Sequence, residues 1–135
     1  EKKKPLLGIC LGMQLLLTRS SEFGKHNGLN LISGNVKNIN DVSSTQLKVP
    51  NIGWNEIEIN KNNKLYSDFN NLSFYFVHSF ISITEKKEDT IANCKYFNLQ
   101  IPAIIRKEKI LGCQFHPEKS GDNGLKFLKT FCDLS

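Results

Sequence analysis

The sequence predicts an α/β fold with an antiparallel insertion. Three observations support this fold class: the chain opens on a strand, a turn and a helix in "PLLGICLGMQLLL", continues through a run of strands, and closes on a helix in "SGDNGLKFLKTFCDL". With 135 residues it has the length of one domain, and we expect residues 1–135 to form a single domain without internal repeats.

The opening stretch, residues 5–17, is predicted to be a buried strand, a tight turn and an apolar helix. Gly8, Cys10 and Gly12 occupy the turn, and glycine permits a strained backbone of the kind that presents a nucleophile. The start of the helix should lower the pKa of the Cys10 thiol, and the Leu11 N–H should point at an oxyanion. Taken alone, the stretch is equally compatible with a buried structural cysteine.

The middle of the chain is predicted to consist mainly of strands. A connection rich in Gly, Ser and Asn leads to a short strand at residues 29–36. A loop at residues 50–55 precedes a strand in which Ile57 and Ile59 alternate with glutamates. The asparagine-rich residues 60–71 are expected to form a surface loop that contains one helical turn.

The aromatic and β-branched run "LSFYFVHSFISIT" is predicted to be one near-continuous strand, buried on both faces. Three shorter strands follow in "DTIANCKYF", "IPAIIRKE" and "ILGCQFHPE". In the closing helix, Ser120 or Asp122 can cap the N-terminus. The apolar residues that recur there at helical spacing are Leu125, Leu128, Phe131 and Cys132.

Composition argues against several classes of protein. The net charge is +5, but the lysines are scattered and form no basic stripe interleaved with aromatics, so we expect no binding of nucleic acid. No apolar run approaches the roughly 18 residues of a membrane span, and no signal peptide is evident, so a cytoplasmic protein is expected. Four well-separated cysteines favour free thiols, and the three histidines show no zinc-ligand spacing, so we expect no metal site.

A second candidate catalytic segment, "GCQFHPEKSG", lies near the end of the chain. If the strand continues, Gln114, His116 and Glu118 lie on one face. The Glu118 carboxylate could then hold the His116 imidazole in the tautomer that takes a proton from Cys10. For an isolated H-x-E, a structural histidine followed by a surface glutamate is the more common outcome.

Together, "GICLGMQ" and "QFHPEKS" resemble the Cys-His-Glu triad of class I glutamine amidotransferases, here Cys10, His116 and Glu118. "KVPNIGWNEI" and "FYFVHSF" narrow the resemblance to glutaminase subunits of imidazole glycerol phosphate synthase, over essentially the whole chain. The resemblance implies a flavodoxin-like three-layer sandwich with a mixed, mostly parallel sheet. It also implies a glutaminase in histidine biosynthesis that needs no cofactor.

Such subunits hydrolyse glutamine to glutamate and ammonia. The ammonia passes to a (β/α)8-barrel cyclase/synthase subunit of the heterodimer, which forms imidazole glycerol phosphate and an aminoimidazole carboxamide ribotide. By the same resemblance Gln14 would bind the substrate amide, Glu22 its α-amino group, and the backbone of Ser79 and Phe80 would complete the pocket. Without the resemblance, Gln14 would be interpreted as a polar residue at the start of a helix, and Glu22 as a solvated residue at a helix end.

Trp54, Tyr75 and Lys119 match family positions that face the synthase, and their types suit an interface. Without the resemblance, Trp54 would be assigned to the core, Tyr75 to sheet packing and Lys119 to a solvated surface. His78 lies on the opposite strand face from Ser79, and we expect it to be structural.

The chain departs from the family pattern in three places. Family members carry first sheet strands and a glycine-rich oxyanion loop before the nucleophile strand, whereas only Glu1 to Lys4 precede it here. We therefore expect those N-terminal strands to be absent and the chain to be the C-terminal two thirds of a longer protein. Phe80 replaces a tyrosine and Asn51 a histidine. Two alternatives stay open: an inactive truncated fragment, and a paralogous glutaminase that supplies ammonia for amidination of a bacterial surface sugar.

Overall fold

The computed structural model of the protein describes residues 4–60 and 63–133. The strands are β1 (Leu6–Ile9), β2 (Arg19–Ser20), β3 (His26–Asn27), β4 (Gly34–Asn38), β5 (Asn51–Ile59), β6 (Ser73–His78), β7 (Phe80–Thr84), β8 (Thr90–Tyr96), β9 (Leu99–Lys107) and β10 (Ile110–Cys113). The α-helices are α1 (Leu11–Leu15), α2 (Ile39–Val42) and α3 (Gly121–Asp133), and the 3-10 helices are η1 (Lys64–Phe69), η2 (Lys87–Asp89) and η3 (Pro117–Lys119).

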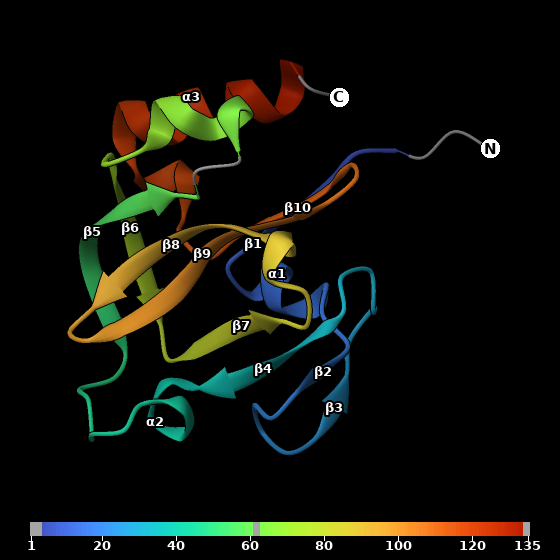
Figure 1. The fold of residues 1–135 in the computed structure, drawn as a ribbon, viewed down its shortest axis with the longest axis vertical. Helices are drawn as coiled ribbons and strands as arrows, with labels where there is room; N and C mark the ends of the chain where they lie inside the picture. Colours follow the sequence, from blue (N-terminus) through green and yellow to red (C-terminus); the bar gives the residue numbers. More distant parts are fainter. Residues whose placement is uncertain (1–3, 61–62, 134–135) are drawn as a thin grey trace.

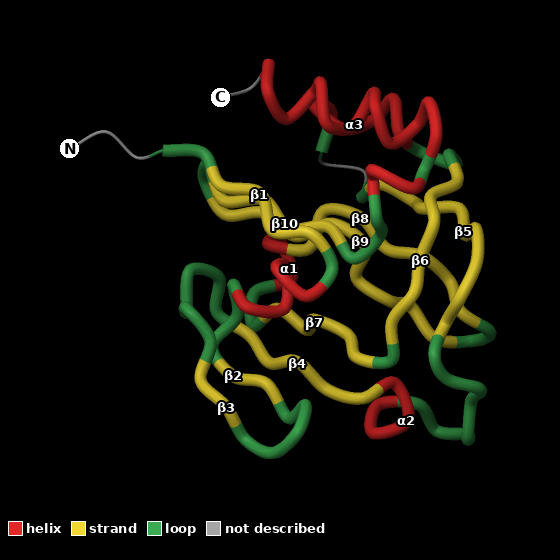
Figure 2. Tube along the Cα trace, turned by 180° about the vertical axis from the view of Figure 1, so that it is seen from behind, coloured by secondary structure: helices red, strands yellow, loops and turns green. Residues whose placement is uncertain are grey.

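These elements build two sheets in a layered arrangement. The larger sheet has the strand order β1-β10-β9-β8-β5-β6, and the smaller has the order β3-β2-β4-β7. In Figure 1 the larger sheet runs through the middle, with α3 on one side and α1 and the smaller sheet on the other. Figure 2 shows the same layers from behind. The predicted α/β fold with a mixed sheet is confirmed.

The balance of parallel and antiparallel pairs differs from the expectation. Among the described strands, β1 pairs with β10 and β2 with β4 in parallel, and the other pairings are antiparallel. The expected predominance of parallel strands is therefore wrong for this part of the chain. Parallel neighbours need a long crossover, whereas the short connections from β8 to β9 and from β9 to β10 can close only antiparallel hairpins.

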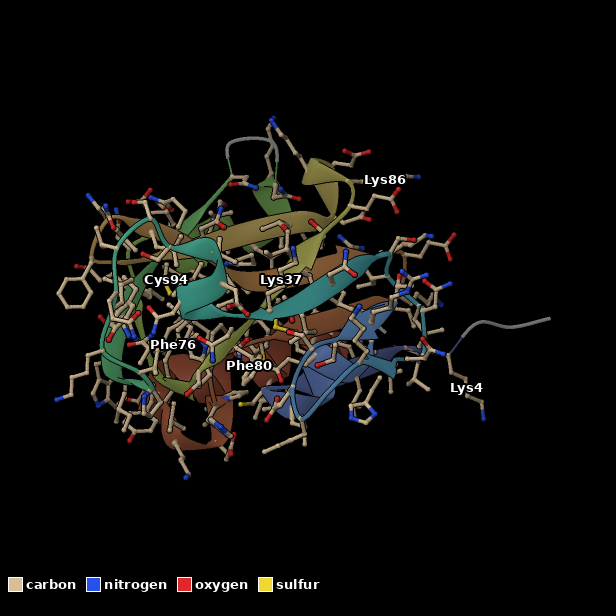
Figure 3. All side chains as sticks on the ribbon, turned by 90° about the horizontal axis from the view of Figure 1, so that it is seen from below. Lys4, Lys37, Phe76, Phe80, Lys86 and Cys94 are labelled. Carbon is tan, nitrogen blue, oxygen red and sulfur yellow. The ribbon has the colours of Figure 1, made fainter. Side chains whose placement is uncertain are left out.

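The aromatic run at residues 72–84 forms two strands instead of one. Strand β6 belongs to the larger sheet and β7 to the smaller, so the chain crosses between sheets at Ser79. The Ser79 carbonyl accepts a hydrogen bond from the Ile39 N–H at 2.9 Å. Buried and half-buried residues alternate along β6, so the expected burial on both faces is also wrong. Figure 3 labels Phe76 and Phe80, which lie on either side of the crossing.

The strand expected at residues 29–36 begins later, at the start of β4. The residues before it close the C-terminal end of α1: Leu29 N–H donates to the Leu15 carbonyl at 2.8 Å, and Leu31 N–H donates to the Leu16 carbonyl at 2.9 Å. Because the last carbonyls of a helix have no partner within the helix, these N–H groups satisfy them. The same groups are then not available to a sheet ladder.

Two further boundaries differ from the expectation. Strand β5 begins at Asn51, within the expected loop at residues 50–55, because it pairs with β6 from its first residue. The expected surface loop after β5 contains η1, and Tyr66 and Phe69 on η1 are buried. Residues 61–62 of that expected loop lie outside the described residues.

Apolar side chains fill the space on both faces of the larger sheet. On the α3 side, the rings of Phe74 and Phe115 stack with centroids 4.2 Å apart, and Phe127 meets Phe115 edge-on at 5.0 Å. The group on the α1 side consists of Met13, Leu16, Leu17, Ile32, Val36 and Ile105. These two groups hold the layers together.

The predicted closing helix is confirmed as α3, but its buried face is rotated relative to the face that the spacing indicated. Phe127 is fully buried, and Leu128 and Phe131 are half-buried. Leu125 is 68% exposed and Cys132 is also exposed. The helix therefore packs through Phe127, Leu128 and Phe131, with Phe127 at the centre of the contact.

Cys10, Cys94 and Cys113 are free thiols, as predicted: Cys94 and Cys113 are buried and Cys10 is half-buried. Cys132 is exposed. Within residues 4–60 and 63–133, no group of three or more His, Cys, Asp or Glu side chains is placed to hold a metal ion. No helix in these ranges is long and apolar enough to cross a membrane.

Candidate active site

Cys10 occupies a sharp turn between β1 and α1. Its φ of 53° and ψ of −105° lie outside the regions that residues with a side chain usually adopt. Its N–H donates to the Cys113 carbonyl at 2.8 Å, which extends the parallel pairing of β1 with β10 by one residue. The predicted strand, strained turn and helix are confirmed.

The two glycines of this turn have different roles. A Cβ on Gly8 would lie 2.6 Å from the Gly12 carbonyl oxygen and 2.8 Å from the Met13 nitrogen. Gly8 therefore allows α1 to pack closely against β1. A Cβ on Gly12 would meet no atom within 4 Å, so Gly12 leaves open space beside the turn.

The Cys10 turn borders a pocket of about 370 Å³. Helix α1, the segment after β2 and the crossing from β6 to β7 form its walls. The residues that line it are Cys10, Leu11, Gln14, Glu22, Phe23, Val77, His78, Ser79 and Phe80. The structure thus brings the expected oxyanion donor and all four expected substrate-binding residues together around Cys10.

Two side chains fix the wall of this pocket at the Phe80 carbonyl. Gln14 is 6% exposed, and its Nε2 donates to this oxygen at 3.2 Å. His78 Nδ1 lies 2.9 Å from the same oxygen. Because one bond comes from α1 and the other from β6, the position of Phe80 is fixed relative to both elements.

His78 belongs to a chain of buried polar groups. Its Nε2 lies 3.2 Å from Asn51 Nδ2, while Asn51 Oδ1 accepts from Asn55 Nδ2 at 3.3 Å. An amide nitrogen only donates, so Nε2 must accept, and Nδ1 carries the proton that is donated to Phe80. Burial lowers the pKa of His78 to about 4, with a further lowering by His116. His78 is therefore neutral at pH 7, as suits a structural histidine.

His116 and Glu118 follow the end of β10. The strand ends at Cys113, and Glu118 lies in η3, so the expected continuation of the strand is wrong. Their contact nevertheless forms through the helical turn, with Nδ1 of His116 2.8 Å from Oε2 of Glu118. Burial raises the pKa of Glu118, but the hydrogen bond with His116 and the charge of Lys119 contribute to a larger lowering, so the net pKa is below its ordinary value.

The loop that carries His116 is bound to the free edge of β6. His116 N–H donates to the Tyr75 carbonyl, and Tyr75 N–H donates to Ser120 Oγ, both at 2.9 Å. Ser120 Oγ donates in turn to the His116 carbonyl at 2.6 Å. The sequence indicated Ser120 only as a candidate helix cap, because its contact with β6 spans 45 residues of chain.

Cys10 and His116 both follow the carboxyl ends of their strands, β1 and β10. Because these two strands are parallel neighbours, both residues lie at the same end of the strands. The sulfur is 3.8 Å from the Val77 carbonyl oxygen and 3.6 Å from Gln114 Nε2. Among the described residues no hydrogen bond joins it to His116. Catalytic hydrogen bonds are commonly long in a free enzyme and tighten when substrate binds.

Burial raises the pKa of Cys10 above its ordinary value, and the carboxylates of Glu118 and Glu22 add to the rise. The Leu11 N–H and the Gln114 side chain act in the opposite direction. The expected lowering of the Cys10 pKa is therefore wrong for this structure. A helix of five residues contributes little dipole, so burial dominates.

The three residues expected at a partner interface lie near one edge of the larger sheet. Trp54 and Tyr75 face each other across β5 and β6, with ring centroids 6.1 Å apart and an interplanar angle of 68°. Trp54 is 56% exposed, which excludes the core position that the residue type alone suggested. Ile52 is 60% exposed on the same strand, and Lys119 is exposed on η3.

Known proteins are similar to this chain along nearly all of its length. The family model for glutamine amidotransferase class-I matches residues 1–133. Imidazole glycerol phosphate synthase subunit HisH of Chlorobium chlorochromatii (strain CaD3) is 47% identical over 135 residues, which cover 99% of this chain and 66% of that protein. Subunit HisH 1 of Legionella pneumophila (strain Paris) is 43% identical over 144 residues, covering 97% and 65%. The chain thus spans about two thirds of the length of these relatives.

Solved structures show the same fold. A crystal structure of a glutamine amidotransferase superposes with a TM-score of 0.61 at 18% identity, over 95% of this chain and 61% of that one. A glutamine amidotransferase of Thermotoga maritima gives a TM-score of 0.59 at 20% identity, over 96% and 47%. With a family model that matches nearly every residue and relatives this similar along its length, the chain belongs to the class-I glutamine amidotransferases.

Proposed function

We propose that the protein is the glutaminase subunit of imidazole glycerol phosphate synthase, which hydrolyses glutamine to glutamate and ammonia. One observation carries this proposal: the pocket beside Cys10 is lined by the expected oxyanion donor, Leu11, and by the four residues expected to bind glutamine, Gln14, Glu22, Ser79 and Phe80. The names of the relatives that are 43% to 47% identical support the same conclusion.

The proposed reaction is an acyl transfer to Cys10. The thiolate attacks the side-chain carbonyl carbon of glutamine, and the Leu11 N–H stabilises the tetrahedral oxyanion. His116, oriented by Glu118, takes the thiol proton of Cys10 and gives it to the departing amide nitrogen, which leaves as ammonia. It then takes a proton from the water that releases glutamate and returns that proton to the Cys10 sulfur. These steps transfer an acyl group and protons, so we expect the reaction to need no cofactor.

Substrate binding follows from the walls of the pocket. The Gln14 side chain would bind the substrate amide, and the half-buried carboxylate of Glu22 would attract the α-ammonium group. The backbone of Ser79 and Phe80 would pair with the rest of the substrate. Because Gln14 and His78 both hold the Phe80 carbonyl, this backbone is already in place before substrate arrives.

The ammonia would pass to a (β/α)8-barrel cyclase/synthase subunit in a cytoplasmic heterodimer, in which residues 1–135 act as one domain. We place the contact on Trp54, Tyr75 and Lys119. The Trp54 ring is exposed, yet its edge contact with Tyr75 restricts it, and restricted aromatic side chains are efficient interface anchors. Ile52 would extend the apolar part of this surface.

In the alternative, the ammonia would go to an enzyme that amidinates a surface sugar. The departure from the family pattern at Asn51 leaves this alternative open at the level of the sequence. That side chain is 2% exposed and contacts His78 inside the protein. Asn51 is therefore not part of the surface offered to a partner, and it gives no support to the alternative.

The test uses the full-length protein with its synthase subunit. Glutamate release should vanish in Cys10→Ala and persist in Cys132→Ala, which changes an exposed cysteine on α3. Unchanged glutamate release in Cys10→Ala would overturn the triad. Free ammonium should restore the synthase reaction in the Cys10→Ala complex, and failure to do so would overturn the transfer of ammonia.

A further inference from the structure

Gln114 is a buried amide beside the nucleophile, and neither the triad nor the substrate pocket gives it a role. It follows the last residue of β10, and its backbone N–H donates to the Ala103 carbonyl at 2.9 Å. Its side chain is fully buried and extends to Cys10, where Nε2 lies 3.6 Å from the sulfur. The contact therefore joins two residues that are 104 positions apart in the chain.

The other end of this amide is unsatisfied. Gln114 Oε1 is buried and has no hydrogen-bond partner among the described residues. Burying an amide without full hydrogen bonding costs free energy, and an apolar side chain of the same size would avoid that cost. A half-satisfied amide at this position is thus unfavourable for folding, and its one partner is the reacting atom of the site.

The surroundings of the sulfur explain why a donor is useful there. A thiol can donate to the Val77 carbonyl, whereas a thiolate can only accept. The ionisable groups around the sulfur include Glu22, His78, Cys113 and Glu118, besides His116 of the proposed triad. The two carboxylates disfavour a negative sulfur, and His78 is neutral, so neutral donors are needed in addition to the His116 imidazolium that forms when the thiol proton is taken.

We propose that Gln114 is a further catalytic residue, whose side-chain N–H donates to the Cys10 thiolate and stabilises the charged nucleophile together with the Leu11 N–H. This proposal rests on the proposed function, since it assigns Cys10 as the nucleophile. Gln114 neither gains nor loses a proton. Its hydrogen bond weakens when the sulfur becomes a neutral thioester, so it favours the enzyme form that is ready to attack.

The experiment measures the reactivity of Cys10 without any substrate. In the full-length protein, iodoacetamide alkylation of Cys10 is followed by peptide mass spectrometry as a function of pH. Gln114→Met keeps the length of the side chain and removes the donor. A hydrogen bond to a charged group has a strength equivalent to about one to two pH units, so the midpoint of alkylation should rise by about that much. Gln114→Glu should raise it further.

Gln14→Met is the matched control. Gln14 is the other buried glutamine at this site, but its amide bonds the Phe80 carbonyl and does not touch the sulfur. Its substitution should leave the alkylation midpoint in place while raising the KM for glutamine. If the substitutions acted only through packing in the pocket, both would shift the alkylation midpoint by the same amount. That result would overturn the proposal.

An unchanged midpoint in a folded Gln114→Met protein, with cooperative thermal unfolding as the check, would also overturn it. If that variant does not fold, Gln114→Leu, which also removes the donor without adding a charge, decides in the same way. Failure of the proposed function would look different. Glutamate release would then persist in Cys10→Ala, while the alkylation midpoint would still depend on Gln114.

Discussion

Ser120 Oγ donates a 2.6 Å hydrogen bond to the His116 carbonyl and accepts a hydrogen bond from the Tyr75 N–H at 2.9 Å. Ser120 is 1% exposed, so water cannot replace either bond. One hydroxyl therefore fixes the loop of the candidate catalytic histidine to β6 at Tyr75. Tyr75 also belongs to the proposed partner surface.

Ser120→Ala should lower the glutaminase kcat with little change in KM, because His116 loses its support while the pocket stays intact. It should also lower the free energy of unfolding by about 1–3 kcal/mol, since it leaves buried groups unpaired. Ser67→Ala is the control: that hydroxyl bonds the Lys64 carbonyl on an exposed 3-10 helix. Equal kcat values in Ser120→Ala and wild type would contradict the positioning role.

Phe127→Ala should lower the free energy of unfolding by about 3–5 kcal/mol, as large-to-small changes of buried aromatics do. Its ring is fully buried and meets Phe69 and Phe115 edge-on. Leu125→Ala, on the exposed side of the same helix, should change the free energy of unfolding by less than about 0.5 kcal/mol. Urea unfolding of the full-length protein measures both, and equal losses would show that α3 does not pack through Phe127.

Trp54→Ala should weaken binding of the synthase subunit by about 2 kcal/mol or more, the loss typical of an aromatic anchor, with little effect on the stability of the protein alone. Phe97→Ala is a matched control, because Phe97 is 64% exposed and meets Tyr96 edge-on at 4.8 Å. Calorimetric titration of the two subunits gives the comparison. Comparable losses in both variants would contradict an interface centred on Trp54.

His78 predicts how stability changes with pH. An unfolded histidine binds a proton below a pH of about 6.5, whereas the pKa of His78 in the folded protein is about 4. Between these values the unfolded state binds more protons, so the free energy of unfolding should fall as the pH drops from about 6.5 to about 4.

His78→Gln should flatten this pH dependence, because it removes the group whose protonation favours the unfolded state. His26→Gln, an exposed histidine whose Nε2 lies 2.8 Å from the Phe23 carbonyl oxygen, is the control. Chemical unfolding at several pH values measures the slope. A slope that is the same in His78→Gln and wild type would show that His78 is not buried as a neutral group.

Local sequence signals identified the parts of the site that depend on short-range geometry. The turn at Cys10 requires Gly8, and that requirement is visible in the residue types. The pair His116 and Glu118 is predicted by the resemblance of "QFHPEKS" to the family triad, because the H-x-E spacing alone does not distinguish it from a structural histidine, and a helical turn instead of a strand brings the two residues together. The closing helix was equally recognisable from its period.

What the sequence could not show depends on contacts between distant segments. The run of aromatic and β-branched residues continues past Ser79, so nothing local reveals that the chain changes sheets there. The exposed Leu29 and Leu31 look like strand residues, yet their N–H groups close a helix. The spacing predicts Gln114 on the same strand face as His116, but the contact of Gln114 with Cys10 exists only because β1 and β10 are neighbours.

Because the chain changes sheets at Ser79, the walls of the pocket are attached to two different sheets. One side of the proposed glutamine site is anchored in the larger sheet through β6, and the other in the smaller sheet through β7. Its width is therefore set by the relative orientation of two sheets. Substitutions at their packing surface, such as those at Val36 or Ile105, would alter substrate affinity from a distance, without any change to a residue that meets glutamine.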